Sequence, residues 1–459
     1  MNAVLIAMLP EHLLLAGMVG LILMAIVGAK PRYALPWALL AVGAAAVSAA
    51  LLAAAGTTLA PFAGHYSVAP PWLVAKALVL ALALPVLLMS RHDFDGVEFP
   101  LLLLSSLYGV ALMLSSDSFL TLFLGLEIMS LPVYVLVLLA YRRPQSAEAA
   151  LKYLVLGGAA SATFLMGVSL LYGTSGSMAI SMFGLALSAD SPLLRAAIVL
   201  ILLAFFLKAS VVPFHAWAPD AYEGASVPVT AYMAVIVKSG VLLAVVRLFG
   251  IGRLATPMTE LVAVLPLASI VWGNLAAMKQ PSLRRMIAYS GIAHAGYLFY
   301  ALLGDPAGRL QSVTFYLVAY GLLNLLAFAA LPAAADDGER DRLDNLRGLF
   351  HREPYAALMI GAAMLSLAGI PPFPGFVAKF LIFRNVMAAG YTTYAVLGLV
   401  GSYLGIYFYL RVIQLMFMSP DAKVAPTPQG GALARGASAA CFAATVLLAV
   451  FPGWLLARL

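Results

Sequence analysis

Charged residues are scarce in this sequence. Of its 459 residues, 10% are Asp, Glu, Lys or Arg and 64% are hydrophobic, whereas an average soluble domain is about a quarter charged and roughly half apolar. So few charges cannot cover the surface of a soluble protein of this length, which excludes soluble, disordered and nucleic-acid-binding proteins. The mean hydropathy of +1.01 therefore indicates a protein whose solvent is the lipid bilayer.

Cysteine is nearly absent as well. The single residue, Cys441, excludes a disulfide framework and a Cys-ligated iron–sulfur cluster in this chain. Glycine-rich nucleotide-binding loops are missing too, since neither GxGxxG nor GxxxxGK(S/T) occurs in a strand–helix context. We therefore expect neither a cofactor nor a metal in this chain. The first apolar stretch begins near Leu13 without a preceding basic region, which predicts a retained helix and not a cleaved signal peptide.

The chain is rich in long apolar runs. A membrane-spanning helix needs about 20 mostly apolar residues, and the sequence predicts 14 such helices, so the expected fold class is an all-α polytopic membrane protein. Continuous apolar runs, without alternating polar residues, exclude a β-barrel. The expected spans are residues 10–29, 34–55, 72–90, 98–115, 118–140, 149–173, 192–217, 226–249, 258–278, 283–303, 309–332, 355–387, 391–417 and 433–456.

Lys and Arg gather in one set of loops, which predicts the orientation of the chain. Arg142, Arg143, Arg284, Arg285 and the charged segment 336–353 lie in these loops, and the opposite loops hold far fewer basic residues. The positive-inside rule makes the first set cytoplasmic. With an even number of spans, both termini are then expected outside the cytoplasm. We interpret segment 336–353 as a solvated connector or a contact with a neighbouring protein.

A few ionisable residues lie inside the expected spans, where a charge costs about 2.5–3.5 kcal/mol even on the gentler insertion scale. These residues are Glu127, Lys208, Lys238, Lys379, Lys152 and His294. Lys152 is near the cytoplasmic end of its span and can reach the interface. Burial without a partner disfavours the charged form of a lysine, whereas a neighbouring carboxylate favours it. One carboxylate among several lysines therefore suits a proton relay better than a lattice of ion pairs.

Simpler interpretations of the same residues stay open. Glu127 and one lysine can form a purely structural pair, and His294 can be a hydrogen-bonded packing residue. His215 lies near Asp220 and Glu223 in the sequence, but their spacing is not one of the tight zinc patterns. We interpret this group as a helix cap or as a place where protons are taken up or released at the cytoplasmic surface.

Prolines interrupt two of the expected spans next to a lysine. Pro213 follows Lys208, and Lys379 is preceded by Pro371, Pro372, Pro374 and Gly375. Proline removes a backbone donor, and freed carbonyls at membrane depth must face protein or a water-filled cavity. Paired interruptions are typical of transporters with internal repeats. We therefore expect two inverted five-helix repeats, helices 4–8 and 9–13, with helices 7 and 12 broken. The expected units are residues 1–97, 98–250, 251–417 and 418–459.

Several long strings in the sequence resemble a known family. They are LGLEIMSLPVYVL, EAALKYLVLGGAASATFLMGVSLLYG, KASVVPFHAWAPDAYEGA, RRMIAYSGIAHAGY, FYLVAYGLLNLLAF and LAGIPPFPGFVAKF. The chain resembles the antiporter-like membrane subunits of the proton-pumping NADH:quinone oxidoreductase, respiratory complex I, and most of all subunit N. Subunits L and M of that family carry His and Lys on helix 11, where this chain has Tyr316, Tyr320 and Asn324.

The resemblance implies a role for each of the intramembrane residues. Glu127 matches the family's helix-5 glutamate, which pairs with the helix-7 lysine, here Lys208. Lys238 matches the central helix-8 lysine, Lys379 the helix-12 residue that connects to the far side, and Lys152 a helix-6 lysine of subunit N. The path from Lys238 to Lys379 is then left to His294, tyrosines and water.

The function implied by the resemblance is proton translocation by a membrane-arm subunit that has no redox centre of its own. NADH, FMN, iron–sulfur clusters and quinone are expected in other subunits, subunits K and M are expected as neighbours, and the expected location is the bacterial inner membrane with periplasmic termini. Two alternatives share the fold: a subunit of an Mrp-type sodium/proton antiporter, and a membrane subunit of a hydrogenase or formate hydrogenlyase. A purely structural spacer is a further alternative.

Overall fold

The computed structural model describes residues 2–140, 144–187, 191–250, 252, 256–332, 340–419 and 431–459. Eleven of the described helices are long and apolar enough to cross a membrane, so the chain is a multi-span membrane protein. Three further expected spans fall on the shorter apolar helices at 98–114 and 354–368 and on the more polar helix at 283–300. Arg142, Arg143 and residues 336–339, which contributed to the expected orientation, lie outside the described residues.

The N-terminal part combines apolar helices with a small β-hairpin, which the all-α expectation missed. Strands β1 (Leu59–Phe62) and β2 (Tyr66–Val68) pair in antiparallel fashion and contact the first helix. The remaining elements are α1 (Asn2–Ala7), α2 (Leu9–Ile26), η1 (Pro31–Tyr33), α3 (Ala34–Ala54), α4 (Pro70–Met89) and η2 (Ser90–His92). We call the end of the bundle that carries the hairpin the hairpin face.

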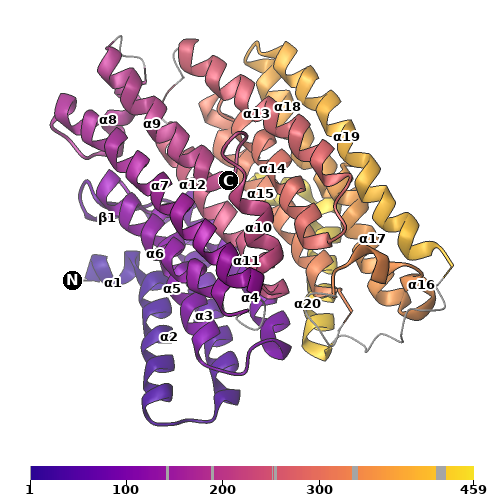
Figure 1. Ribbon diagram of the computed structural model, residues 1–459. Helices are drawn as coiled ribbons and strands as arrows, with labels where there is room; N and C mark the ends of the chain where they lie inside the picture. Colours follow the sequence, from indigo (N-terminus) through magenta and orange to yellow (C-terminus); the bar gives the residue numbers. More distant parts are fainter. Residues whose placement is uncertain are drawn as a thin grey trace.

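The first expected repeat contains several long helices and one interruption, which lies between the helices at 192–209 and 217–224 (Figure 1). Its elements are α5 (Glu98–Leu114), α6 (Phe119–Leu138), α7 (Pro144–Ser175), α8 (Ile180–Ala186), α9 (Pro192–Ala209), α10 (Trp217–Gly224), α11 (Val227–Tyr232), the π-helical turn η3 (Met233–Val237) and α12 (Lys238–Phe249). The segment expected as one span at 192–217 thus ends as a helix at Ala209, and Pro213 lies in the irregular stretch before α10.

The second expected repeat contains the other interruption. Its elements are α13 (Thr256–Ala277), α14 (Leu283–Tyr300), η4 (Pro306–Gly308), α15 (Arg309–Ala329), η5 (Leu343–Leu346), α16 (Leu349–Arg352), α17 (Pro354–Ala368), α18 (Pro374–Ala388) and α19 (Thr392–Phe417). Pro371 and Pro372 lie between α17 and α18, whereas Pro374 and Gly375 begin α18. Both interrupted helices end at a residue in the left-handed conformation, Ser210 (φ 62°) and Gly369 (φ 85°).

Two buried segments form the centre of the bundle. The segment Val227–Phe249, which comprises α11, η3 and α12, is 100% buried over its most apolar window, and Pro306–Ala329, which contains α15, is 94% buried. By contrast, the corresponding windows of the long peripheral helices α7 and α19 are 33% and 39% buried. Lys238 of α12 is therefore enclosed by protein, and the peripheral helices present apolar side chains outward.

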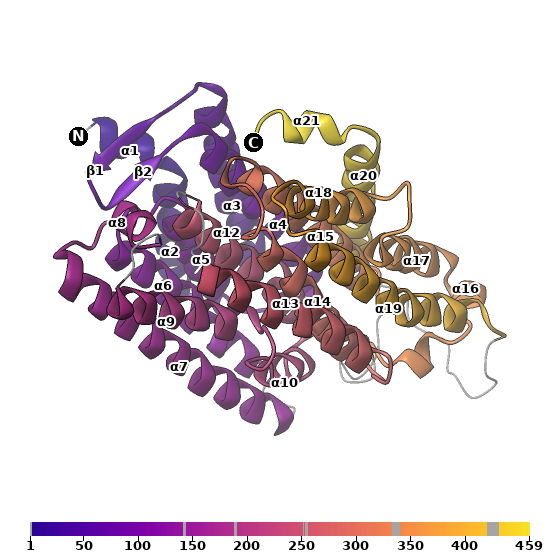
Figure 2. The same cartoon turned by 90° about the horizontal axis from the view of Figure 1, so that it is seen from above.

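Both ends of the chain lie at the hairpin face (Figure 2). The last elements are α20 (Ala432–Val450) and the short α21 (Pro452–Leu456). The side-chain amide of Gln311, at the start of α15, donates to the backbone oxygen of Leu456 at 2.6 Å. Leu310, the residue before Gln311, lines the same cavity as Ser67 of the hairpin. Therefore α21 and the hairpin lie at the same face.

Candidate functional site

Glu127 of α6 and Lys208 of α9 lie together in the membrane-spanning part of the bundle. The Lys208 ammonium is 3.6 Å from the nearer carboxylate oxygen, and the two side chains are 7% and 24% exposed. Lys208 also donates to the Ser130 hydroxyl at 3.1 Å, and Ser161 donates to Glu127. A cavity of about 10 Å³ adjoins Lys208 and Ser161, which is room for about one water molecule.

Lys238 begins α12 directly after the π-helical turn η3 and is buried. Its ammonium donates to the Gly291 carbonyl of α14 at 2.6 Å and lies 5.9 Å from the centre of the Tyr320 ring. In the described part of the chain, no carboxylate lies within ion-pair distance of it. Single π-helical turns occur often at functional sites. This one was not predictable from the sequence, because the apolar pattern runs through it without a break.

Lys379 of α18 is held by the interruption between α17 and α18. Its ammonium donates to the carbonyls of Leu367 and Ala368 at 3.1 and 3.2 Å and to the Ser402 hydroxyl at 3.0 Å. The two carbonyls are among the last of α17, which have no partner inside the helix. The interruption thus supplies polar backbone to a buried lysine, as the prolines predict.

His294 of α14 lies between the two tyrosine-rich helices α15 and α19. Its Nδ1 is 2.8 Å from the Tyr316 hydroxyl and its Nε2 is 3.2 Å from the Tyr409 hydroxyl. A neutral imidazole donates through one nitrogen and accepts through the other, so both contacts can be satisfied at once. The sequence pointed to Tyr316 and Tyr320 but missed Tyr409, because α19 is remote in the chain and reads as ordinary apolar helix.

Two more tyrosines connect His294 to the lysines. The Tyr320 ring is 4.6 Å from the His294 ring, and it also faces Lys238. The Tyr297 ring is 5.5 Å from the His294 ring and 5.4 Å from the Lys379 ammonium. A continuous line of contacts therefore runs from Lys238 to Lys379. No hydrogen bond among the described residues joins Lys208 to Lys238, so the first half of the expected path has a gap.

The residues expected at the cytoplasmic surface separate into two groups. Asp220 pairs with Lys152 at 2.7 Å and with Arg285 at 2.9 Å, and Arg285 also pairs with Glu223 at 2.8 Å. Partial burial raises the pKa of Asp220, but the hydrogen bonds from Lys152 and Arg285 outweigh burial and hold that pKa below its ordinary value. Lys152 lies in the third turn of α7 and Arg285 in the first turn of α14, so this network is near one end of the bundle and not at mid-membrane.

His215 does not join that network, contrary to its grouping with Asp220 and Glu223 from the sequence. Its Nε2 accepts from the Trp272 indole at 2.9 Å, on the side of α13. Neighbours in sequence point apart here because the chain turns from the irregular stretch into α10. Among the described residues, no group of three or more His, Cys, Asp and Glu side chains is close enough to hold a metal ion.

A second carboxylate in the membrane region, Glu11, was not predicted from the sequence, where only Glu127 was expected. Glu11 of α2 and Lys76 of α4 form an ion pair in which both side chains are at most 1% exposed. Lys76 also donates to the Ser115 hydroxyl at 2.6 Å and to Tyr66 at 3.4 Å. Glu11 stands at the start of an otherwise uninformative apolar run, so the sequence offered no partner for Lys76.

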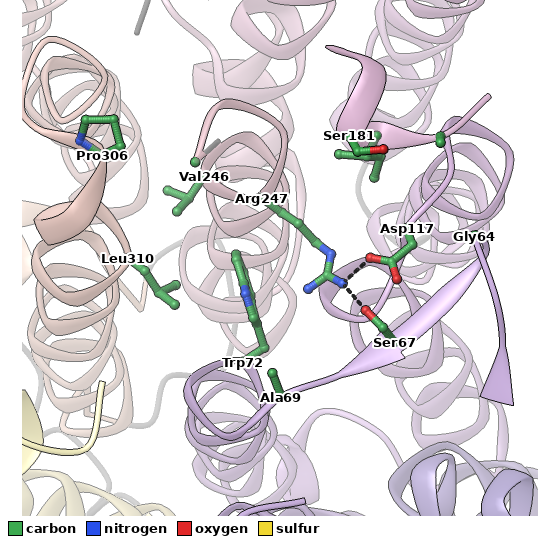
Figure 3. Close-up of a pocket in the computed structure, with 13 residues that line it drawn as sticks. Gly64, Ser67, Ala69, Trp72, Asp117, Ser181, Val246, Arg247, Pro306 and Leu310 are labelled. Carbon is green, nitrogen blue, oxygen red and sulfur yellow. Dashed lines mark hydrogen bonds and ion pairs between the residues drawn. The ribbon is translucent and has the colours of Figure 1, made fainter. Parts of the chain in front are cut away.

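A cavity of about 550 Å³ opens at the hairpin face close to this pair (Figure 3). Its charged side chains are Asp117 and Arg247, joined at 2.8 Å. Arg247, near the end of α12, also donates to the Ser67 hydroxyl at 3.0 Å and to the Leu114 carbonyl at 2.8 Å. Figure 3 shows Trp72 beside the Arg247 guanidinium. The guanidinium carbon lies 4.9 Å from the centre of the Trp72 ring. These contacts fasten α12 to the hairpin and to the end of α5.

Comparisons with known proteins point to one family. The family model described as NADH:quinone oxidoreductase/Mrp antiporter, TM matches residues 116–405. NADH-quinone oxidoreductase subunit N of Pelobacter propionicus is 37% identical over 453 residues, which cover 97% of this chain and 95% of that protein. The chain belongs to this family. The subunit N of Desulfitobacterium hafniense is 36% identical and is matched over 85% of this chain and 82% of its own length.

Solved structures of the family share the fold. A chain of respiratory complex I from Thermus thermophilus is 36% identical, with a TM-score of 0.85 over 97% of this chain and 98% of that chain. A chain of the Mrp complex from Dietzia is 23% identical, with a TM-score of 0.84 over 98% of this chain and 96% of that chain. At that identity the second likeness concerns the fold alone, so the functional argument rests on the subunit N relatives.

Proposed function

We propose that this chain is a proton-translocating membrane-arm subunit, subunit N, of an NADH:quinone oxidoreductase. The observation that carries the proposal is the buried line from Lys238 through Tyr320, His294 and Tyr297 to Lys379. Each member can give or accept a proton or can orient a neighbour that does. Ionisable residues are expensive in the membrane and are by default functional there.

Glu127 and Lys208 are proposed as the switch that starts the transfer. Two unit charges about 4 Å apart interact by about 4 kcal/mol at an effective dielectric of about 20. A change in their separation, driven from a neighbouring subunit, therefore alters the proton affinity of Lys208. The change passes through water to Lys238 and then along the line to Lys379. Lys152, Asp220, Glu223 and His215 lie at the surface where protons are exchanged.

The proposal includes the arrangement of the chain in the complex. The 14 expected spans and the two inverted repeats correspond to α5–α12 and α13–α19, with α2–α4 before them and α20 after them. The termini and the hairpin face are placed in the periplasm, and the membrane is the bacterial inner membrane. NADH, FMN, iron–sulfur clusters and quinone bind to other subunits, and subunits K and M are the proposed neighbours.

The test is the number of protons pumped per NADH oxidised by the assembled complex. Lys238→Met and Lys379→Met each remove a member of the line while keeping an apolar side chain of similar length, and both should lower this ratio. Lys279→Met, at an exposed position after α13, is the matched control and should leave the ratio unchanged. An unchanged ratio in both core variants would contradict the proposal. Sodium transport without NADH oxidation would favour an antiporter instead.

A further inference from the structure

An apolar groove runs along the outside of the bundle between α4, α15 and α20. Its volume is about 750 Å³. Small residues, including Ala437, Ala440 and Ala444, line it on α20, opposite Leu78 and Leu88 of α4. Apart from Cys441, the lining side chains are aliphatic or aromatic. The groove is separate from the lysine line.

The groove has the dimensions of one lipid chain. From Leu78 to Leu88 the α4 wall is about 15 Å long at the helical rise per residue. One leaflet of a hydrocarbon core about 30 Å thick has about the same depth. An acyl chain that enters one leaflet therefore matches the length of this groove.

Aromatic and basic residues stand at the hairpin-face end of the groove. Trp454 of α21 lines the groove and is 61% exposed. The Arg458 guanidinium lies 4.2 Å from the centre of its ring and donates to the Trp454 carbonyl at 2.9 Å. In the described part of the chain, no carboxylate pairs with Arg458. Trp is enriched at membrane interfaces, and an arginine there has donors suited to a phosphate.

We propose that an anionic phospholipid occupies this groove, with one acyl chain between α4 and α20 and its phosphate at Arg458. Gln311 holds α21 over the groove by its bond to Leu456, so the phosphate position is fixed relative to α15. Since α15 carries Tyr316 and Tyr320, the bound lipid supports the helix that lines one side of the proposed proton path. Apolar burial retains the chain, and Arg458 selects the charge of the headgroup.

Photo-crosslinking in membranes that contain the full complex tests this proposal. The probes are phosphatidylglycerol and phosphatidylcholine, each with a diazirine near the end of an acyl chain, and labelled peptides are located by mass spectrometry. We expect phosphatidylglycerol to label peptides of α4 and α20 several-fold more than phosphatidylcholine does. Arg458→Gln should reduce this preference severalfold, whereas Arg384→Gln, an exposed arginine beside Phe380, should not.

A second variant pair tests the chain-binding part of the groove. Ala444→Phe fills the groove and should reduce labelling by both lipids, while Ala443→Phe, on the exposed side of α20, should leave it unchanged. The amount of chain recovered in the complex is measured for each variant, so that labelling is compared at equal assembly. Absence of labelling in α4 and α20 would mean that protein covers the groove. If the two lipids label the groove equally and Arg458→Gln changes nothing, Arg458 does not recognise the anionic headgroup. Either result overturns the proposal.

Discussion

Two Glu–Lys pairs, Glu127–Lys208 and Glu11–Lys76, have opposite characters. Glu127 and Lys208 are separated by 3.6 Å, and Glu127 is 24% exposed. Lys208 has a hydrogen bond of its own to Ser130. Glu11 and Lys76 are fully enclosed under the hairpin and in direct contact. The first pair has room to change its separation, whereas separating the second would leave a buried charge without a partner. A glutamate and a lysine are therefore proposed to act as a switch in Glu127–Lys208 and to stabilise the fold in Glu11–Lys76.

The largest effect is expected from breaking the enclosed pair. Glu11→Gln and Lys76→Met each leave one buried partner unpaired, which typically costs about 3–5 kcal/mol. We expect much less assembled complex in the membrane and a lower unfolding temperature for the complex that remains. The double variant Glu11→Leu/Lys76→Met should recover most of the assembly, since replacing both charges by apolar groups is often neutral. If the single variants assemble fully but pump poorly, the two pairs are alike and the comparison is wrong.

The opposite result is expected for the loose pair. Glu127→Gln keeps the shape of the side chain. Because Glu127 is 24% exposed and 3.6 Å from Lys208, less is lost than at the enclosed pair, so assembly should stay normal. The proton-to-electron ratio should fall, because the lysine no longer has a charge whose distance can vary. The ratio is measured in vesicles that contain the assembled complex. A normal ratio with normal assembly would remove Glu127 from the proposed switch.

Charged residues and prolines inside apolar runs were predictable from the sequence. Glu127, Lys208, Lys238 and Lys379 interrupt apolar runs, and the prolines beside two of them marked the breaks that the structure contains. They stand out because a charge or a proline costs free energy in a membrane helix. The coarse fold followed from the same apolar runs.

Features that depend on tertiary contacts were not predictable. Glu11 meets Lys76 only because α2 packs near α4, and Tyr409 reaches His294 across 115 positions of sequence. The π-helical turn before Lys238 leaves the apolar pattern unchanged. The hairpin was missed because β1 and β2 are too short to show an alternating pattern. The separate contacts of His215 and Asp220, with Trp272 and with Lys152, were not predictable either, since closeness in sequence does not fix direction after a broken helix.

Another enclosed ion pair, Arg284 and Asp341, extends the comparison to pH. Burial raises the pKa of Asp341, but the Arg284 guanidinium and hydrogen bonds from the Arg284 amide and the Ser282 hydroxyl outweigh burial and hold that pKa below its ordinary value. A lowered carboxyl pKa stabilises the folded state above the unfolded value of about 3.9, and this stabilisation is lost as the pH falls through the folded pKa. Thermal unfolding of the complex should therefore become less pH-dependent at acid pH in Asp341→Asn. The same acid dependence in wild type and variant would show that the pair contributes nothing.

The smallest effect is expected within the proton path. Tyr409→Phe removes the hydroxyl beside His294 Nε2 but keeps the ring, and a neutral hydrogen bond is worth about 1 kcal/mol, or roughly fivefold in rate. We expect the pumping rate to fall by about that factor with normal assembly. Tyr407→Phe is the matched control, because Tyr407 is 61% exposed on the same helix. A pumping rate as unaffected as that of the control would exclude Tyr409 from the path.

The central claim is that a proton can travel inside this chain from Lys208 to Lys379. Its most direct test is a density map of the assembled complex at a resolution that shows ordered water. We expect water molecules to bridge the gap between Lys208 and Lys238, where no side chain of the described residues does so, and further water along the line to Lys379. A gap filled by apolar side chains and free of water in every state of turnover would contradict it.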